Sequence, residues 1–250
     1  MVGEDAAADA VARARRLPGL RVGLHVVLVE GRPVLPPDEV PDLVDGAGRF
    51  RNDMVAAGFR FFFRPAVRRQ LAAEIRAQFE AFRRTGLALD HANAHKHFHL
   101  HPTVAALMLE IGAEYGLKAV RVPEEPGQPI EAAGGEAGGP GARALRLWTH
   151  QLRWAVRRHG LLANDHVFGL AWTGAMTEDR LLALIPHLPE GLSEIYFHPA
   201  TRRTASLAAA MPEYRHEAEL GALTSAAARA AFDRAGIGRT SFGALAERAA

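Results

Sequence analysis

The sequence predicts an α/β protein in which parallel strands alternate with helices. Short runs rich in branched and aromatic residues alternate along the chain with segments of helical period, and this alternation is typical of parallel strands joined by helical crossovers. The chain has 250 residues, 48% of them hydrophobic, which suffices for a substantial core. Layered α/β sheets and (β/α) barrels share the pattern, and both carry their chemistry at the carboxyl ends of the strands.

Five strands are expected from short apolar runs that turn residues delimit. The first, 20-LRVGLHVVLVEG-31, is rich in β-branched residues and ends in Glu-Gly. The others are residues 87–95, 118–123, 166–172 and 193–200. Three histidines satisfy this carboxyl-end rule: His25 lies in the first strand, and His95 and His198 lie near the ends of theirs. We therefore expect these three side chains at the functional edge of the sheet.

Segments of helical spacing precede and separate the strands. They cover residues 5–16, 65–86, 103–116, 143–159, 178–187 and 224–236. Pro65 suits the first turn of the second segment, and Gly86 suits its end. Thr177 is a candidate N-cap, and Glu178 and Asp179 behind it complement the positive end of the helix dipole.

Two long segments lack a regular period. Residues 32–64 are rich in proline and close on the aromatic cluster 59-FRFFFRP-65, which we interpret as the plug of a core edge, with a greasy lid over a lipid-like substrate as the alternative. Residues 124–142 are rich in Gly and Pro. Because the strand-helix alternation resumes beyond them, residues 1–250 are interpreted as one domain with two long loops.

The composition excludes several classes of protein. A net charge of +2 and the absence of a Lys/Arg block argue against a nucleic-acid partner. The chain has no cysteine, which excludes disulfides, thiolate metal sites and a cysteine nucleophile. The start, 1-MVGEDAAADA-10, lacks the apolar core of a signal peptide, and no 18-residue apolar run occurs. We therefore expect a cytoplasmic protein.

A comb of four histidines defines the candidate site. His95, His97, His99 and His101 occupy alternate positions in 93-NAHKHFHLHP-102, and five of the 12 histidines of the chain fall within residues 91–101. In an extended segment this alternation places all four rings on one side. Imidazole is a good ligand for Zn²⁺, Ni²⁺, Fe²⁺ and Co²⁺. The comb, with His25 from another strand, therefore predicts an open metal site that activates water; adventitious binding by a His-rich tract is the alternative.

Other chemistries find less support in the motifs. The Gly-rich segment 134-GGEAGGPG-141 matches neither phosphate-binding pattern, and no GxSxG elbow of a serine hydrolase occurs. The comb alone also fits a different metal hydrolase, of amidohydrolase-like or phosphoester-cleaving type.

Four segments occur in the order and spacing of a known family: 22-VGLHVVL-28, 90-DHANAHKHFHLHP-102, 195-IYFHPA-200 and 223-LTSAAARAAF-232. With them, the chain resembles the YdjC-like carbohydrate deacetylases over essentially its whole length. The segments 30-EGRPVLPPDEVPDLVDGAGRF-50 and 93-NAHKHFHLHPT-103 resemble the branch associated with hopanoid biosynthesis. The resemblance implies a distorted TIM-like (β/α) barrel and a metal-dependent deacetylase that removes acetyl from an N-acetylated amino sugar.

The resemblance also implies roles for individual histidines. His25 and His95 match the two metal-binding histidines of the family, with Mg²⁺ as the expected metal and Zn²⁺ as the alternative. His198 matches the histidine that serves as acid or oxyanion partner. His97 and His99 match positions near the substrate, and His101 has the least support.

The chain departs from the family at its start. Family members begin with a strand that ends in a T-A-D-D-F-G-like motif, whose two Asp supply the base and the carboxylate ligand, and no DDFG occurs here. Asp5 and Asp9 fall on a predicted helix, and Asp90 has the wrong spacing and is interpreted as a strand-end residue. We therefore expect a barrel without its first strand and no catalytic base or carboxylate ligand within these 250 residues, with a misplaced start codon as the simplest cause.

For the branch, the resemblance implies an N-acetylglucosaminyl hopanoid lipid as substrate. That substrate predicts peripheral contact with a membrane, made by the phenylalanines at 59 and 61–63, and a homodimer is among the expected assemblies. The alternative function is a truncated, non-catalytic homologue that binds a sugar or lipid.

Overall fold

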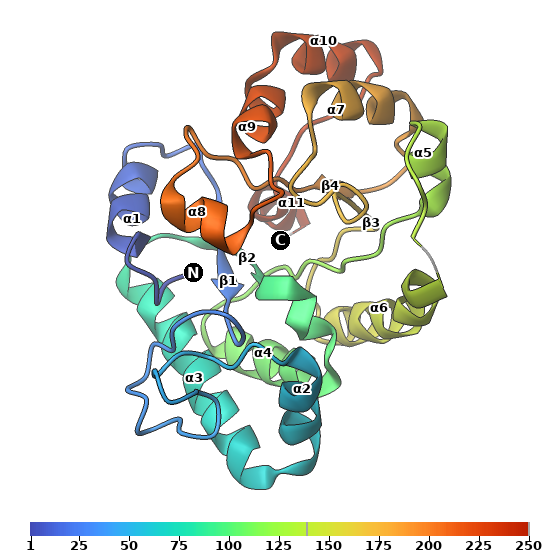
Figure 1. Cartoon of the computed structure of the whole chain (residues 1–250). Helices are drawn as coiled ribbons and strands as arrows, with labels where there is room; N and C mark the ends of the chain where they lie inside the picture. The colour runs from blue at the N-terminus through green and yellow to red at the C-terminus, as the bar shows by residue number, and fades with distance from the viewer. Residues whose placement is uncertain (139, 250) are drawn as a thin grey trace. The chain divides into compact units, whose positions relative to one another are not determined.

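The computed structural model describes residues 1–138 and 140–249 and divides into two compact units. Unit 1 comprises Met1–Arg121, His150–Ala163 and Thr240–Ala250, and unit 2 comprises Val122–Thr149 and Asn164–Arg239. Both units combine parallel strands with helices (Figure 1), so the predicted α/β class is confirmed.

Unit 1 is built around two parallel strands, β1 (Val22–Val26) and β2 (Leu89–Ala94). Their register pairs His25 with Asn93. The parallel pairing continues beyond β2 through single bridges, from Ala92 to Val120 and from Ala119 to Leu162. The strand predicted at 118–123 is thus reduced, within unit 1, to isolated bridges.

Helices cover this small sheet. They are α1 (Ala7–Arg15), α2 (Met54–Phe63), α3 (Pro65–Arg84), α4 (Pro102–Glu114), α11 (Phe242–Ala249) and the second half of α6 (Pro140–Arg158). The predicted α3 is confirmed: Pro65 begins it, and the buried residues Leu71, Ile75, Phe79 and Phe82 follow the expected spacing. Because that apolar stripe faces the core, burial rather than intrinsic propensity holds α3 in place.

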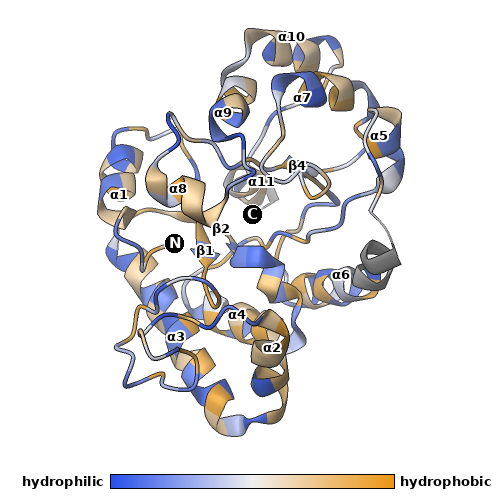
Figure 2. Cartoon of the chain, in the orientation of Figure 1, coloured by the Kyte–Doolittle hydropathy of each residue, from blue (hydrophilic) through white to orange (hydrophobic). Residues whose placement is uncertain are grey.

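Helix α2 corrects the expectation that residues 32–64 are irregular throughout. Asp53 begins the helix, because its Oδ1 accepts the N–H of Ala56 at 2.9 Å and so satisfies one of the free donors of the first turn. Phe61 is buried, whereas Phe59, Phe62 and Phe63 remain exposed. Figure 2 colours most of α2 as hydrophobic. The aromatic cluster is therefore split between the core and the surface.

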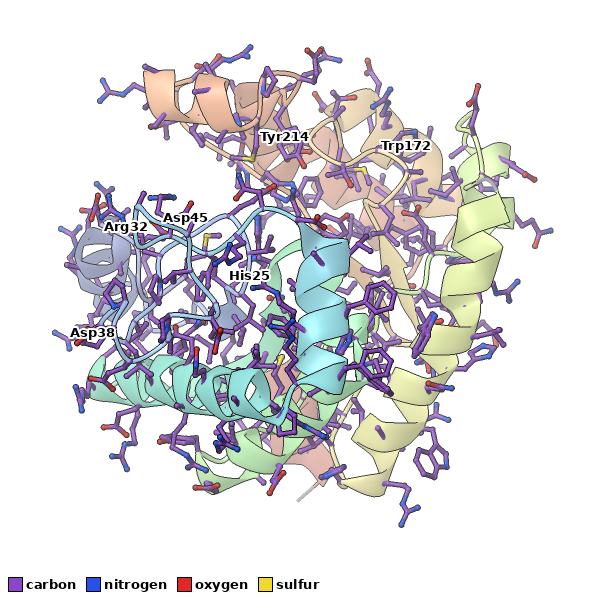
Figure 3. The ribbon with its side chains drawn as sticks, turned by 60° about the horizontal axis from the view of Figure 1, so that its bottom comes forward. His25, Arg32, Asp38, Asp45, Trp172 and Tyr214 are labelled. Carbon is purple, nitrogen blue, oxygen red and sulfur yellow. The ribbon has the colours of Figure 1, made fainter. Side chains whose placement is uncertain are left out.

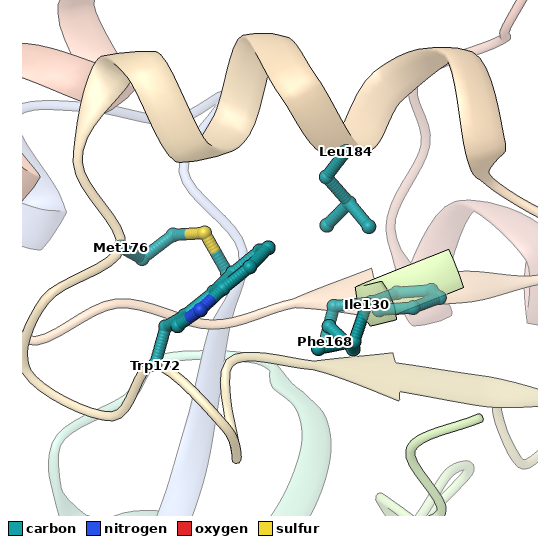
Figure 4. Close-up of a cluster of buried hydrophobic side chains, with 5 residues drawn as sticks. All are labelled: Ile130, Phe168, Trp172, Met176 and Leu184. Atoms are coloured by element: carbon teal, nitrogen blue, oxygen red, sulfur yellow. The ribbon is translucent and has the colours of Figure 1, made fainter. Parts of the chain in front are cut away.

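Unit 2 contains the parallel strands β3 (His166–Phe168) and β4 (Ser193–Ile195). Its helices are α5 (Gly127–Ala132), α7 (Glu178–Leu184), α8 (Ala205–Ala210), α9 (His216–Thr224) and α10 (Ala226–Arg234). A short 3-10 turn, Ile185–His187, follows α7. The cluster in Figure 4, Ile130, Phe168, Trp172, Met176 and Leu184, forms part of the core of unit 2.

Two expectations for unit 2 need correction. The segment 124–142 contains the helix α5, whose Ile130 is buried, so it is not a plain loop. The helix expected at 224–236 begins only after Ser225, which has an extended backbone and whose Oγ accepts the N–H of Ala228. Ser225 thus follows the last residue of α9 and is the N-cap of α10, so the residues on its two sides belong to separate helices.

The TIM-like barrel is not confirmed. Among the described residues, the strands form two two-stranded parallel sheets and do not close on one another. The expected strands have six to twelve residues, whereas the strands that form have only three to six. A search of the described helices also finds none long and apolar enough to cross a membrane.

Candidate functional site

His25 and His95 lie together at the carboxyl ends of β1 and β2 in unit 1. Their rings are 5.6 Å apart between centroids and meet edge to face. The Nδ1 of His25 lies 2.5 Å from the Oδ1 of Asn93, the residue paired with it across the sheet. An amide oxygen only accepts hydrogen bonds, so His25 donates through Nδ1 and keeps the lone pair of Nε2 for a ligand. Figure 3 marks His25 with Arg32, Asp38 and Asp45 of the segment after β1.

Both histidines are kept uncharged. Burial lowers the pKa of His25 to about 3, and the hydrogen bond with Asn93 only partly opposes this effect. Burial also lowers the pKa of His95, against the opposing charge of Glu30. A metal ion binds neutral imidazole, so the two rings are already in the protonation state that coordination requires.

The comb is not extended, which corrects the expectation that its four rings share one side. Residues His95–Leu100 form a kinked 3-10 turn, and Lys96 and His97 have φ angles of 52° and 54°. A backbone in the left-handed region abolishes the period-two alternation of side chains. The four rings therefore meet different surroundings.

His99 holds the backbone of unit 1 together. Its ring is fully buried; Nδ1 accepts the N–H of Ala94 at 3.2 Å, and Nε2 donates to the carbonyl oxygen of Arg121 at 2.8 Å. With both nitrogens occupied and no exposed surface, the His99 ring is not available for direct contact with a substrate. It positions the end of β2 instead.

The rings of His97 and His101 have other neighbours than the ring of His95. The ring of His97 lies 6.1 Å from that of His99. The ring of His101 lies among Phe61, Phe62 and Phe98, at centroid distances of 6.1, 6.3 and 6.2 Å. His101 therefore belongs to the aromatic packing beneath α2. Of the comb, His95 alone is joined to His25 by a ring contact among those described.

Glu30 is one of two residues of this site that the sequence did not reveal. Its Oε1 pairs with the Nζ of Lys96, and its Oε2 lies 3.7 Å from the Nε2 of His95. The second distance is an electrostatic contact, too long for a hydrogen bond. Asn93 was also missed, although its position opposite His25 follows from the register. The only signal for Glu30 was the Glu-Gly pair that ends the first strand.

The residues present fit a divalent metal only in part. His25 and His95 offer two neutral imidazoles, and the described side chains include no group of three or more His, Asp or Glu arranged to hold an ion. Asp90 is buried near the start of β2, where its Oδ1 accepts the N–H of Gly243 at 2.7 Å.

His198 belongs to unit 2, where a buried carboxylate organises its surroundings. Glu219 is 1% exposed; its Oε2 accepts the backbone N–H of His198 and lies 4.0 Å from the Nδ1 of the ring, and its Oε1 accepts the N–H of Met176. The rings of Tyr196 and Tyr214 flank His198 at 5.6 and 5.0 Å. Glu219 thus positions His198, and sequence analysis missed it because it lies in a segment without a recognised motif.

Comparison with known proteins defines the family. The model of the YdjC-like protein family matches residues 1–234, so the chain belongs to this family. A carbohydrate deacetylase of Brevibacillus brevis is 37% identical over 115 residues, which are 46% of this chain and 43% of that protein. One of Geobacillus stearothermophilus is 29% identical over 202 residues, which are 80% of this chain and 66% of that protein.

The coverage is partial on the side of the relatives. The chain spans less than half of the Brevibacillus protein and of a carbohydrate deacetylase of Oceanobacillus iheyensis, where the match covers 44% of that protein at 34% identity. The crystal structure of an Enterococcus faecalis protein named for cellobiose-phosphate cleavage matches this chain with a TM-score of 0.69 and 21% sequence identity. It covers 98% of this chain and 85% of that one, which supports a shared fold.

Proposed function

We propose that this protein removes the acetyl group from an N-acetylated amino sugar. The observation that carries the proposal is the pair of neutral, half-buried imidazoles, His25 and His95, at the carboxyl ends of adjacent parallel strands. The carbohydrate deacetylases among the relatives favour this chemistry over the other metal hydrolases that the comb allows.

In the proposed reaction, a water oxygen adds to the acetamide carbonyl carbon, the C–N bond breaks, and acetate and a free amine leave. His25 and His95 would hold a divalent metal, Mg²⁺ or Zn²⁺, which when bound supplies a Lewis acid and an activated water. Asn93 fixes the ring of His25 through its Nδ1. The leaving amine needs one proton, and His198 of unit 2 is the proposed donor.

We also propose a lipid-linked substrate, the N-acetylglucosaminyl hopanoid of the branch that the sequence resembles. The support is the outer face of α2, where Val55, Phe59, Phe62 and Phe63 are 55–70% exposed. Burial lowers the pKa of Arg60, and the nearby charges of Arg51 and Arg64 lower it further against the opposing charges of Asp42 and Asp53, so three arginines lie beside this apolar face. Exposed aromatic residues next to arginines are typical of helices that lie at a membrane surface.

Acetate release tests the proposal. Purified protein supplied with Mg²⁺ or Zn²⁺ should release acetate from an N-acetylglucosaminyl lipid, and His95→Ala should reduce the rate at least about 100-fold, because it removes an interaction with the reacting centre. His159→Ala, a change at an exposed histidine, is the matched control. A protein that binds the glycolipid without releasing acetate would instead be the non-catalytic homologue.

A further inference from the structure

The backbone around the candidate site is strained at three positions. Among the described non-glycine residues, a positive φ occurs at Glu30, Lys96 and His97, with values of 55°, 52° and 54°. None of the three is an Asn or Asp, the side chains that tolerate this conformation best. All three follow the ends of the paired strands β1 and β2. Strain that collects in one place at strand ends points to a function for the residues that bear it.

Two of the three strained residues, Glu30 and Lys96, are joined through their side chains. Glu30 comes from the segment after β1, and its carboxylate reaches across to Lys96 and to the ring of His95 in the turn after β2. The left-handed backbone at Glu30 directs this carboxylate towards the second strand. Glu30 thereby faces the Nε2 side of His95 and favours the tautomer in which that nitrogen carries the proton.

The surrounding structure holds the strained segment on both sides. Before it, both the N–H and the carbonyl oxygen of Val27 are bound by the amide of Gln78. After it, the N–H groups of Val34 and Leu35 donate to the carboxylate of Glu74 at 2.9 and 3.0 Å. Gln78 and Glu74 both belong to α3. A rigid helix therefore enforces the unfavourable turn between them.

We propose that Glu30 is a positioning residue, whose strained backbone conformation serves to hold its carboxylate against the ring of His95. The inference rests on the proposed function, because it makes Glu30 a determinant of how His95 acts. It adds to that function a carboxylate within the chain that orients a site histidine.

Substitutions at Glu30 separate strain from function. Glu30→Gly relieves the backbone strain and removes the carboxylate, whereas Glu30→Ala removes the carboxylate and keeps the strain. We expect the glycine variant to unfold at a higher temperature than the alanine variant, while both lose about 10- to 100-fold in kcat/KM for acetate release. Glu30→Gln, which keeps the side-chain length, should lose activity without a comparable loss of stability.

A matched control removes an ion pair elsewhere. Glu114→Gln breaks the pair between Glu114 and Arg76, whose side chains are somewhat more exposed than those of Glu30 and Lys96, and should leave kcat/KM unchanged. If Glu30→Gly is more stable than Glu30→Ala and retains full activity, the carboxylate has no positioning role and the proposal is overturned.

A second readout is independent of the reaction. The ¹⁵N chemical shifts of His95 report which ring nitrogen carries the proton, and we expect the Nε2–H form in the wild type and a larger Nδ1–H fraction in Glu30→Gly. Identical tautomer populations in the two proteins would refute the role of Glu30. A wild type that releases no acetate but shows the expected change in tautomer would refute the proposed function and retain the inference.

Discussion

The ring of His99 is kept neutral by its surroundings. Its pKa is lowered from 6.5 to about 3, mainly by burial. Nearby basic groups also lower it, and the hydrogen bond to the carbonyl oxygen of Arg121 only partly opposes these effects. In the neutral ring, Nδ1 accepts the N–H of Ala94 and Nε2 donates to the carbonyl oxygen of Arg121. Protonation would break the bond to Ala94, so folding and protonation of His99 oppose each other.

This opposition predicts an acid-sensitive fold. Between pH 6.5 and about 3 the unfolded chain binds a proton at this residue that the folded chain does not, so the contribution of His99 to the free energy of unfolding is complete above pH 6.5 and is lost as the pH falls towards 3. His99→Gln should destabilise the protein at neutral pH and make its stability less dependent on pH. Urea unfolding of both proteins between about pH 4 and pH 7 measures the two slopes.

The matched control is His187→Gln, at an exposed histidine, which should leave the slope unchanged. His25, whose pKa burial also lowers to about 3, keeps part of the slope in the His99 variant. Equal slopes in wild type and His99→Gln would contradict the prediction.

At single residues, the sequence predicted the proximity of His25 and His95 better than the surroundings of the other comb histidines. The pairing of His25 with His95 could be expected because the carboxyl ends of adjacent parallel strands meet. The separation of His99 and His101 from that pair could not, because it depends on the left-handed backbone at Lys96 and His97, which no local propensity favours. Glu30 was hidden for the same reason.

Helix α3 acts as a polar support for the chain after β1. Its buried Glu74 accepts the N–H groups of Val34 and Leu35 and a bond from Gln78. Glu74→Ala leaves these donors without their partner and should reduce the free energy of unfolding by about 2–4 kcal/mol. Chemical denaturation measures the loss, and Glu80→Ala, on the same helix but at the surface, should change stability little. A loss at Glu80 as large as at Glu74 would show that helix propensity, not the buried bonds, sets the effect.

Helix α2 carries the prediction about lipid. The exposed Phe59, Phe62 and Phe63 should contact the membrane or the lipid tail, whereas Phe61 packs inside against Phe98 and cannot. Changing the three exposed residues to serine should weaken binding to anionic vesicles and turnover of the glycolipid, and should spare a soluble N-acetylsugar. Vesicle sedimentation and acetate assays measure both effects. Equal losses on the two substrates would contradict the lipid contact.

The elements that sequence reasoning recovered are those with a long apolar period. Helix α3 was expected from Leu71, Ile75, Phe79 and Phe82 to within two residues of its end. Helix α2 was missed because prolines upstream dominated the segment and the cap at Asp53 was not recognised. Four of the five expected strands form but are shorter than predicted, and residues 118–123 make only isolated bridges, since apolar composition does not mark where backbone pairing stops.

Across unit 1, the last helix returns to the first sheet. The N–H of Gly243, at the start of α11, donates to the buried Asp90 of β2, and Arg21 pairs with Glu247. A Cβ on residue 243 would lie 2.4 Å from the Oδ1 of Asp90. Gly243→Ala should therefore reduce the free energy of unfolding by about 1–3 kcal/mol, which thermal or urea unfolding measures.

Gly221 provides the comparison. It lies inside α9, and a Cβ there would meet nothing within 4 Å. Gly221→Ala should raise stability by about 0.5–1 kcal/mol, because alanine loses less conformational freedom on folding. Destabilisation by both substitutions would mean that the contact with Asp90 is not the cause at Gly243.

For the whole molecule, the sequence predicted the α/β class and the family, but not the division of the chain into two units. Residues 150–163 and 240–250 join unit 1 from far along the chain. These distant segments are held in unit 1 by contacts such as the hydrogen bond between Asp90 and Gly243, which are 153 positions apart. Contacts of this kind leave no periodic pattern in the sequence.

The amide of Gln78 has a consequence for how the chain folds. It binds the N–H and the carbonyl oxygen of Val27, directly after β1, as a neighbouring strand would. The two residues are 51 positions apart, so the chain must close a long loop before this bond forms. Helix α3 has local contacts and can form early. Strand β1 can then pack on it before β2 pairs with β1. Disturbing Gln78 should accordingly slow refolding, and during that delay the unpaired edge of β1 would be open to pairing with another copy of the chain.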